Sequence, residues 1–229
     1  MRYRATMIEI LASLGESDCE SIGDGFLAQP VNALSSLTFS VVGVAILVWA
    51  GHAVGRERRF RLILGLLFVL TGLGSFLYHG PQTAGSLFAH DITFLAALVV
   101  VAITNGALAL GWSERRSWTV AAVLLITYAV VLVLWPTATN VLTTVSVVLL
   151  VASDVPLHRI GGIAGRWYVA ALVLLGLALG FFVIGRSGAP LCDADSLLQG
   201  HALWHVLSAG ALGAYVVATA PVRERMDGR

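Results

Sequence analysis

The chain has 229 residues, of which 58% are hydrophobic and only 12% are charged, and its mean hydropathy is +0.87. Soluble domains carry about 25% charged residues, so a chain this apolar cannot cover a globule in water and is expected in a bilayer. The net charge of +1 argues against nucleic acid as a partner. All 14 basic residues are arginine, and because a retinal Schiff base requires a lysine amine, a rhodopsin-type photoreceptor is excluded.

An N-terminal segment, residues 1–30, precedes the first long apolar stretch and contains no run that resembles a cleavable signal peptide. A membrane span needs roughly 20 mostly apolar residues, and seven such stretches predict a seven-transmembrane-helix bundle over residues 31–220, followed by a tail at 221–229. The predicted spans are Val31–Ala53, Phe60–His79, Leu87–Leu110, Trp118–Trp135, Thr139–Val155, Tyr168–Ile184 and Leu197–Ala220.

The fourth and fifth spans are the least distinct, because the sequence from Ser117 to Ser153 carries no charge and is too long for one helix. Pro136, Thr139 and Asn140 lie near its middle and predict a tight turn there. Two spans are therefore predicted in this stretch.

The direction of the spans follows from the arginines, because cytoplasmic loops are enriched in Lys and Arg. Of the 14 arginines, 11 lie in the first, third and fifth connections and the C-terminal tail. Arg2, Arg4 and Arg186 lie in the N-terminal segment and the sixth connection. We therefore predict an N-terminus outside the membrane and a cytoplasmic C-terminus. The arginine-only, alanine-rich composition points to a prokaryotic cell membrane.

Three predicted helices bring unusual polar residues to the outer end of the bundle. Ser75 and His79 are four residues apart at the end of the second span, and His201 and His205 have the same spacing at the start of the seventh. Residues with this spacing share one face of a helix. Asp91 begins the third span at a similar depth. Ionisable residues inside membrane spans are costly and usually face a cavity or a partner.

A single histidine near a helix end is usually an interfacial residue, and a single His-x3-His spacing arises by chance. Their shared depth favours one metal site, with His79, His201 and His205 as ligands. Zinc is the preferred metal, because imidazole suits it and three protein ligands leave a position for water. His90 is interpreted as a neighbour of the site, and His158 lies at the opposite end of the bundle.

The site residues have the chemistry of a hydrolase. Zinc-bound water has a pKa near 7, and Asp91 would accept its proton and pass it to the leaving group. Ser75 would donate a hydrogen bond to the developing oxyanion. A site with these groups would cleave an amide or an ester, and its position in the bilayer indicates a lipid substrate.

The chain has two cysteines, Cys19 in the N-terminal segment and Cys192 in the sixth connection. The predicted topology places both outside the membrane, where disulfides persist. A disulfide between them is expected, with two unrelated thiols as the alternative.

These residues together resemble the alkaline ceramidase family, part of a superfamily of seven-span hydrolases that includes adiponectin-receptor-like proteins. The resemblance covers nearly the whole chain. It is carried by Cys19-Glu20, Gln29-Pro-Val-Asn32, Ser75-Phe-Leu-Tyr-His79, Asp91, Cys192 and Gly200-His-Ala-Leu-Trp-His205. It implies zinc on His79, His201 and His205, an oxyanion role for Ser75, proton transfer by Asp91, and hydrolysis of ceramide to a sphingoid base and a fatty acid.

The family's start also binds calcium, so the resemblance makes Glu20 a candidate calcium ligand. The sequence departs from the family here, because Ser17, Ile22 and Gln29 stand where the family has better oxygen ligands. Asp18 and Asp24 are the carboxylates that would compensate.

Three functions remain open from the sequence. The first is a ceramidase-like zinc amidase, and the second is a related hydrolase of an ester or another acylated lipid. The third is a non-enzymatic seven-span receptor or transport protein with a structural metal or a proton relay. The sequence carries no indication of the oligomeric state.

Overall fold

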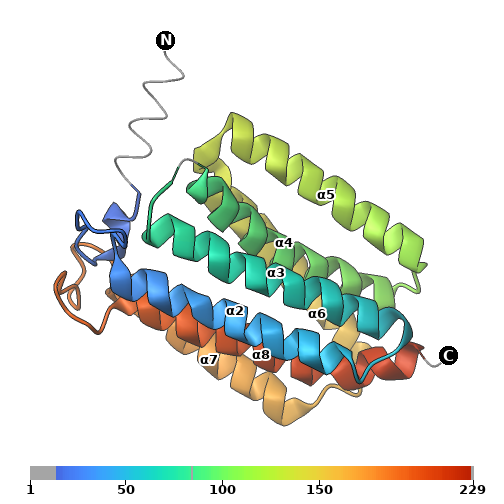
Figure 1. The fold of residues 1–229 in the computed structure, drawn as a ribbon. Coiled ribbons are helices and arrows are strands. Elements are labelled where there is room, and N and C mark those ends of the chain that lie inside the picture. Colours follow the sequence, from blue (N-terminus) through green and yellow to red (C-terminus); the bar gives the residue numbers. More distant parts are fainter. Residues whose placement is uncertain (1–13, 84, 228–229) are drawn as a thin grey trace.

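A computed structural model describes residues 14–83 and 85–227, and these residues form a bundle of long helices (Figure 1). The elements are η1 Glu16–Asp18, α2 Pro30–Ala50, α3 Gly55–His79, α4 Ser86–Ala109, α5 Glu114–Leu134, η2 Pro136–Ala138, α6 Thr139–Ile160, α7 Gly165–Ile184 and α8 Gly200–Asp227. Seven of them are long and apolar enough to cross a membrane. The chain is therefore a multi-pass membrane protein with an all-helical fold, as predicted.

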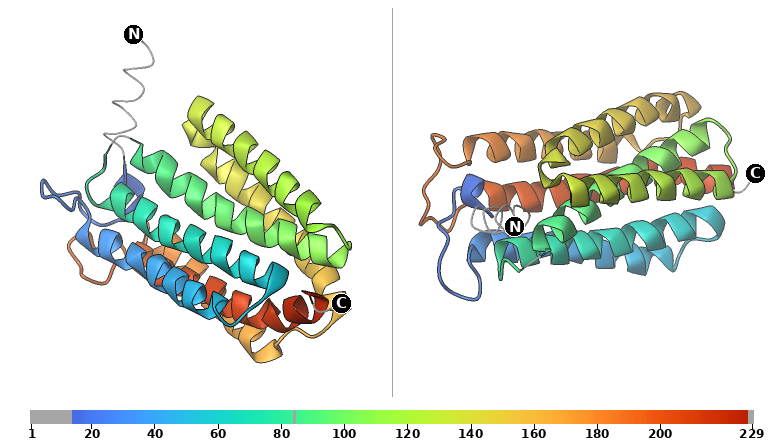
Figure 2. Two further views of the ribbon diagram at one scale, coloured as in Figure 1. Left: turned by 45° about the vertical axis from the view of Figure 1, so that its right-hand side comes forward. Right: turned by 90° about the horizontal axis from the view of Figure 1, so that it is seen from above.

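The helices alternate in direction, so every odd-numbered connection lies at one end of the bundle and every even-numbered one at the other (Figures 1 and 2). The helix α2 packs along α3 and α8, α4 packs against α3 and α6, α7 covers α8, and α5 lies mainly against α4. The predicted turn between the fourth and fifth spans is confirmed as η2, which begins at Pro136.

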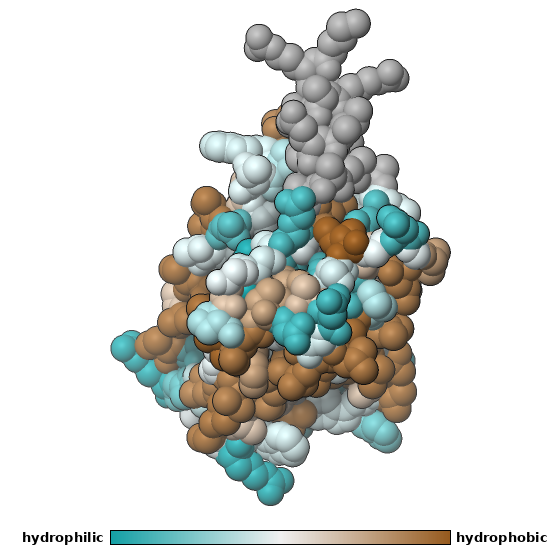
Figure 3. Space-filling view, turned by 90° about the vertical axis from the view of Figure 1, so that its left-hand side faces the viewer, coloured by the Kyte–Doolittle hydropathy of each residue, from teal (hydrophilic) through white to brown (hydrophobic). Residues whose placement is uncertain are grey.

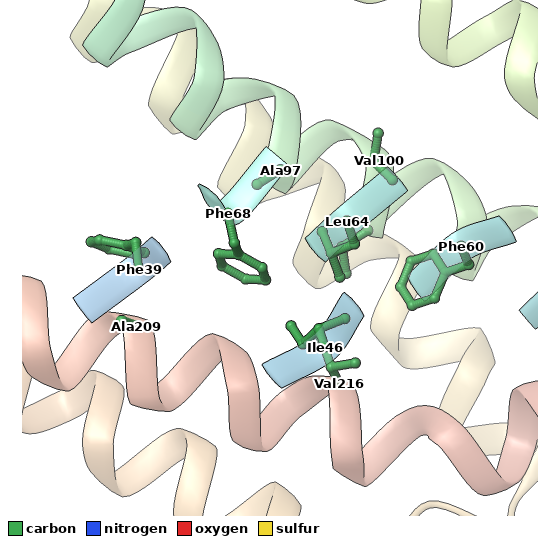
Figure 4. Packing of buried hydrophobic residues seen from close by; sticks show 10 residues of the cluster. Phe39, Ile46, Phe60, Leu64, Phe68, Ala97, Val100, Ala209 and Val216 are labelled. Carbon is green, nitrogen blue, oxygen red and sulfur yellow. The ribbon is translucent and has the colours of Figure 1, made fainter. Parts of the chain in front are cut away.

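The centre of the bundle is a packed apolar core shared by α2, α3, α4 and α8 (Figure 4). Phe39 and Phe68 stack with ring centroids 6.4 Å apart, and Leu64 is fully buried beside them. Outward-facing residues are also apolar, as along α5, where Val123, Ile126 and Val130 are exposed at helical spacing. Side chains of this kind face lipid, which is as apolar as they are.

The last helix extends beyond its predicted end. The boundary was expected at Ala220, but α8 continues to Asp227 through Pro221. Val222 and Arg223 are buried against the bundle, so residues 221–227 pack with the other helices rather than form a separate tail. Residues 1–13 of the expected N-terminal segment lie outside the described residues.

Which end faces the cytoplasm stays a prediction from the arginines. Reporter fusions after Gly80 and after Arg225 should report opposite sides of the membrane, the second one cytoplasmic. Fusions that report the same side would contradict the seven-span topology, and an exchange of the two sides would reverse the orientation.

Glycines let α2 and α3 approach closely, which helps to place the end of α3. A Cβ atom added at Gly43 would lie 2.6 Å from the Gly65 carbonyl oxygen and 2.7 Å from the Val69 amide nitrogen. Both are backbone atoms of the neighbouring helix and cannot move without shifting it. Small residues allow such close packing in membrane helices.

A matched pair of glycine substitutions tests this contact. Gly43→Ala should destabilise the protein by about 1–3 kcal/mol through overpacking, which exceeds the gain of up to about 1 kcal/mol from better helix propensity. Gly176→Ala on α7 meets nothing within 4 Å and should be neutral or stabilising. Thermal unfolding in one detergent measures both, and equal midpoints would show that the α2–α3 contact is loose.

Candidate metal centre

Three buried histidines meet at the end of the bundle where α3 ends and α8 begins. His79 is the last residue of α3, and His201 and His205 lie on the first turns of α8. The ring centroids are 4.9 Å apart for His79 and His201, 5.2 Å for His79 and His205, and 4.5 Å for His201 and His205. One ring nitrogen from each lies within 4.8 Å of the others, so the group could hold a metal ion.

The orientation of His79 is set by the side chain of Gln29, which ends the N-terminal segment. The amide nitrogen of Gln29 donates to the carbonyl oxygens of Gly15 (3.0 Å) and Glu20 (2.8 Å). Its amide oxygen therefore faces His79 and accepts a hydrogen bond of 2.9 Å from Nδ1. Nε2 of His79 is left as the unprotonated nitrogen, buried and without a hydrogen-bond partner.

His205 is oriented in the same way by Ser35 on α2. The Ser35 hydroxyl donates to the carbonyl oxygen of Asn32 (3.0 Å), so it accepts from Nδ1 of His205, 3.0 Å away. Nε2 of His205 is again the nitrogen that keeps its lone pair. It lies 3.4 Å from the hydroxyl oxygen of Ser75, which is buried one turn before His79 on α3. The expected proximity of Ser75 to the histidines is thus observed.

The third histidine faces a carboxylate from the N-terminal segment. Nδ1 of His201 lies 3.4 Å from Oδ1 of Asp18, a close contact without the geometry of a hydrogen bond. Nε2 of His201 is buried and has no hydrogen-bond partner. Histidines that bind metals typically direct their other ring nitrogen to a carbonyl, a hydroxyl or a carboxylate. All three histidines have such a neighbour here.

Unpartnered nitrogens of this kind are costly when buried, at about 1–3 kcal/mol each. The three residues supply three imidazole donors on two helices, a donor type that suits first-row transition metals such as zinc, copper, iron and nickel. The residues present therefore fit a metal ion.

Asp91 is placed beside this group but not in it. The carboxylate is 3% exposed at the start of α4 and accepts hydrogen bonds from the Thr139 hydroxyl and from Nδ1 of His90, the latter at 2.8 Å. The histidine trio is the one cluster of metal-binding type within residues 14–83 and 85–227, and Asp91 is not a member of it. His90 is a neighbour, as interpreted, with its ring centroid 6.1 Å from that of His79.

Glu20 acts as a cap for α2. Its two carboxylate oxygens accept hydrogen bonds from the backbone amides of Val31 (2.7 Å) and Asn32 (2.8 Å). A carboxylate at a helix N-terminus is favourable because the free amides and the helix dipole attract it. Burial raises the pKa of Glu20, and the hydrogen bonds from Asn32 and Val31 lower it in part. Calcium binding by Glu20 stays a prediction.

The predicted disulfide between Cys19 and Cys192 is present, with the Cα atoms 5.5 Å apart. It joins the N-terminal segment to the connection before α8, and the amide of Ser21 also donates to the Ala194 carbonyl oxygen (3.0 Å). The segment is thereby held over the histidines. Viewed onto this end, hydrophilic residues gather over the face and hydrophobic residues lie beneath and beside them (Figure 3).

The residues that orient the histidines were not predicted as such. The sequence assigns Gln29 to the motif that resembles the ceramidase family and, like Asp18, to the candidate calcium site, and it gives Ser35 no role. The Gln-Pro at positions 29 and 30 was the available signal, because it places a polar side chain directly before a membrane span.

We predict that Gln29→Met weakens metal binding by about 10–100-fold, the usual effect of losing the partner that orients a metal-bound histidine. The substitution keeps the length of the side chain but removes the acceptor for Nδ1 of His79. Competition with a chromophoric zinc chelator measures the affinity. Gln82→Met is the control, because Gln82 donates to the Leu14 carbonyl oxygen and does not contact a histidine. Equal affinities in the two variants would contradict the orienting role of Gln29.

Fold and site together define a multi-pass membrane protein with a buried three-histidine group suited to a metal ion. Comparisons with models of known protein families, with curated proteins and with solved structures find no match.

Proposed function

We propose that the chain is a zinc-dependent intramembrane lipid hydrolase, similar to the alkaline ceramidases, that cleaves the N-acyl amide of ceramide or a related acylated lipid. The observation that carries the proposal is the shared orientation of the histidines. His79 and His205 each use Nδ1 for a hydrogen bond, and unpartnered Nε2 atoms of His79 and His201 remain buried in the same group. A structural metal would need a fourth protein ligand, and the group contains three.

Bound zinc would supply a water molecule acidified to a pKa of about 7, a nucleophile at neutral pH. Ser75 lies beside Nε2 of His205, so its hydroxyl can donate a hydrogen bond to an oxyanion that develops next to the metal. Its burial keeps that hydrogen bond out of competition with water.

Asp91 is proposed as the group that accepts the proton of the attacking water and returns it to the leaving amine. Thr139 and His90 hold the carboxylate from two sides. His90 in turn lies against Tyr78, with ring centroids 4.7 Å apart, and Tyr78 lies against His79 at 4.8 Å. Asp91 is thus linked to the histidine group through the packed rings of His90 and Tyr78.

A lipid substrate is proposed because the site belongs to a bundle whose outer faces are apolar along their length. Exposed apolar residues occur on helices that border the site, such as Leu73 and Leu77 on α3 and Val206 on α8. On this proposal a molecule with long acyl chains would approach the site from the bilayer, whereas a water-soluble substrate would approach past the N-terminal segment.

The experiment is mass spectrometry of acylated lipids incubated with the purified full chain, with zinc, with a chelator, and with zinc restored. Release of a fatty acid and a sphingoid base from ceramide that is lost with chelator and recovered with zinc is expected. Release from an ester lipid alone would change the substrate to the ester class. Bound metal without hydrolysis of any acylated lipid would favour the receptor or transport function.

A further inference from the structure

A cavity lined by apolar and charged side chains lies at the opposite end of the bundle from the histidines, where α3 and α5 begin and α4 and α8 end. It is bordered by side chains from all four helices, including Arg56 and Glu57 of α3, Thr104 and Ala107 of α4, Trp118 of α5 and Arg223 of α8. Its volume is ≈ 40 Å³, room for about three water molecules or the oxygens of one small anion.

The buried charges around this cavity do not balance. Arg61 is fully buried and donates from Nε to Glu57 (2.7 Å), which is also buried. It donates from Nη2 to Glu224 (2.5 Å), whose side chain is 54% exposed. Arg223 is a second buried arginine, 4% exposed. Two buried guanidinium groups therefore share one buried carboxylate, and a buried charge is stable only when it is compensated.

Arg223 borders the cavity, and one of its N–H donors has no hydrogen-bond partner. Its Nη2 donates to the Thr104 hydroxyl (3.3 Å) and to the Asn105 amide oxygen, and its guanidinium lies 3.7 Å from the centre of the Phe60 ring. Its Nε is buried and has no hydrogen-bond partner. An unpartnered N–H on a buried cation is the donor that an incoming anion would satisfy.

The other charged groups around the cavity offset its positive charge only in part. Glu57 attracts both Arg61 and Arg223, and Glu114 accepts hydrogen bonds from Nε and Nη2 of Arg59 and also attracts Arg56. Arg56 lines the cavity and donates to the Trp112 carbonyl oxygen (3.0 Å). Four arginines thus surround the cavity with three glutamates, which leaves one positive charge in excess: Arg56, Arg59, Arg61 and Arg223 with Glu57, Glu114 and Glu224.

The position of the cavity suits a membrane headgroup. The helix α3 has 25 residues between the cavity end and His79, which at 1.5 Å per residue is about 37 Å. The hydrocarbon core of a bilayer is about 30 Å thick. With the histidines near one interface, the cavity lies at the level of the headgroups of the other leaflet, where basic pockets between helices bind anionic lipids.

We propose that this cavity binds a phosphate group, held by Nε of Arg223 and the guanidinium of Arg56. The group would come from an anionic phospholipid headgroup or from free phosphate. The site lies at the other end of the bundle from the histidines, so its occupancy is independent of the proposed hydrolysis.

The test is native mass spectrometry of the full chain, stripped of lipid in a neutral detergent, with phosphatidylglycerol, phosphatidylcholine or inorganic phosphate added. One phosphatidylglycerol molecule should bind more tightly than phosphatidylcholine. Arg56→Gln and Arg223→Gln should each weaken that binding by at least about tenfold, since a charge-assisted contact is lost. Arg225→Gln is the control, because Arg225 is exposed and bonds the Gly161 carbonyl oxygen outside the cavity.

Loss of the buried Arg223 can also prevent folding, so Ala107→Leu provides a second approach that changes no charge. Ala107 is 2% exposed and lines the cavity, and a leucine there would occupy the space and abolish binding. Binding of inorganic phosphate with the same dependence on the variants would support the site and identify free phosphate as its ligand. Equal binding of phosphatidylglycerol to wild type, Arg56→Gln and Ala107→Leu, or no preference over phosphatidylcholine together with no phosphate binding, would overturn the proposal.

Discussion

Replacement of any one of the three histidines by alanine should remove the metal and reduce lipid hydrolysis to background. His79, His201 and His205 each supply one of three proposed ligands, and a protein zinc site normally needs at least three protein ligands. The loss of metal affinity should be larger than the loss of about 10–100-fold that is expected when only a residue that orients a histidine is removed. Metal content per chain and fatty acid release are measured on the same preparations.

His158→Ala is the control for these variants. His158 lies near the other end of the bundle, where its partly exposed ring contacts Asp154 and Tyr168. Its replacement should change neither metal content nor hydrolysis. Zinc occupancy that survives all three of the other substitutions, or an effect of His158→Ala as large as that of His205→Ala, would rule out the histidine group as the metal centre.

Asp91→Asn and Ser75→Ala should separate catalysis from metal binding. Asparagine keeps the size of the side chain but cannot accept a proton, so hydrolysis should fall by about 10²–10⁴-fold while zinc remains. Loss of the Ser75 hydroxyl should lower turnover by about 10²–10³-fold, the usual effect of removing an oxyanion donor. Turnover per bound zinc is the quantity to compare.

Two residues of the same types provide controls. Ser146 is a buried serine on α6 that bonds the Leu142 carbonyl oxygen, away from the histidines. Asp193 is an exposed carboxylate in the connection before α8. Ser146→Ala and Asp193→Asn should keep turnover within a few-fold of wild type. If Asp91→Asn keeps full turnover, its contacts with Thr139 and His90 are structural and another group accepts the proton.

The helices and the three histidines could be predicted because one physical constraint governs both. A span must have a minimum apolar length, and successive spans must alternate in direction. The arginine-rich connections and the turn residues between spans therefore indicate where each helix enters and leaves the membrane. His79 at the end of one span and His201 near the start of another must then lie at the same depth. Their packing together needed only that α3 and α8 be neighbours.

The surroundings of the histidines could not be predicted, because they depend on how an irregular segment folds. Gln29 and Asp18 meet the rings from a loop whose path is set by a disulfide and by the capping of α2, whereas Ser35 meets the His205 ring from α2 itself. No periodic pattern encodes such contacts. The position of Asp91 within its helix was predicted, but its pairing with Thr139 of α6 depends on the packing of α4 and α6.

The continuation of α8 beyond Ala220 could not be predicted either, because it also depends on tertiary contacts. Polar residues such as Arg223 and Glu224 mark the end of a membrane span, and Pro221 often ends a helix. In the structure Arg223 finds Asn105 and the Phe60 ring, and Arg61 holds Glu224. These tertiary contacts compensate for the proline and extend the helix beyond the apolar stretch.

The most direct test of the metal centre is zinc K-edge absorption spectroscopy of the purified full chain. Three imidazole nitrogens at about 2.0–2.1 Å and one further light atom from water are expected, the shell of a three-histidine catalytic zinc. Replacement of any one of the three histidines by alanine should abolish the protein-bound zinc signal. A shell that contains sulfur, an octahedral shell of oxygens, or a chain that holds no zinc when zinc is supplied would contradict a metal centre at His79, His201 and His205.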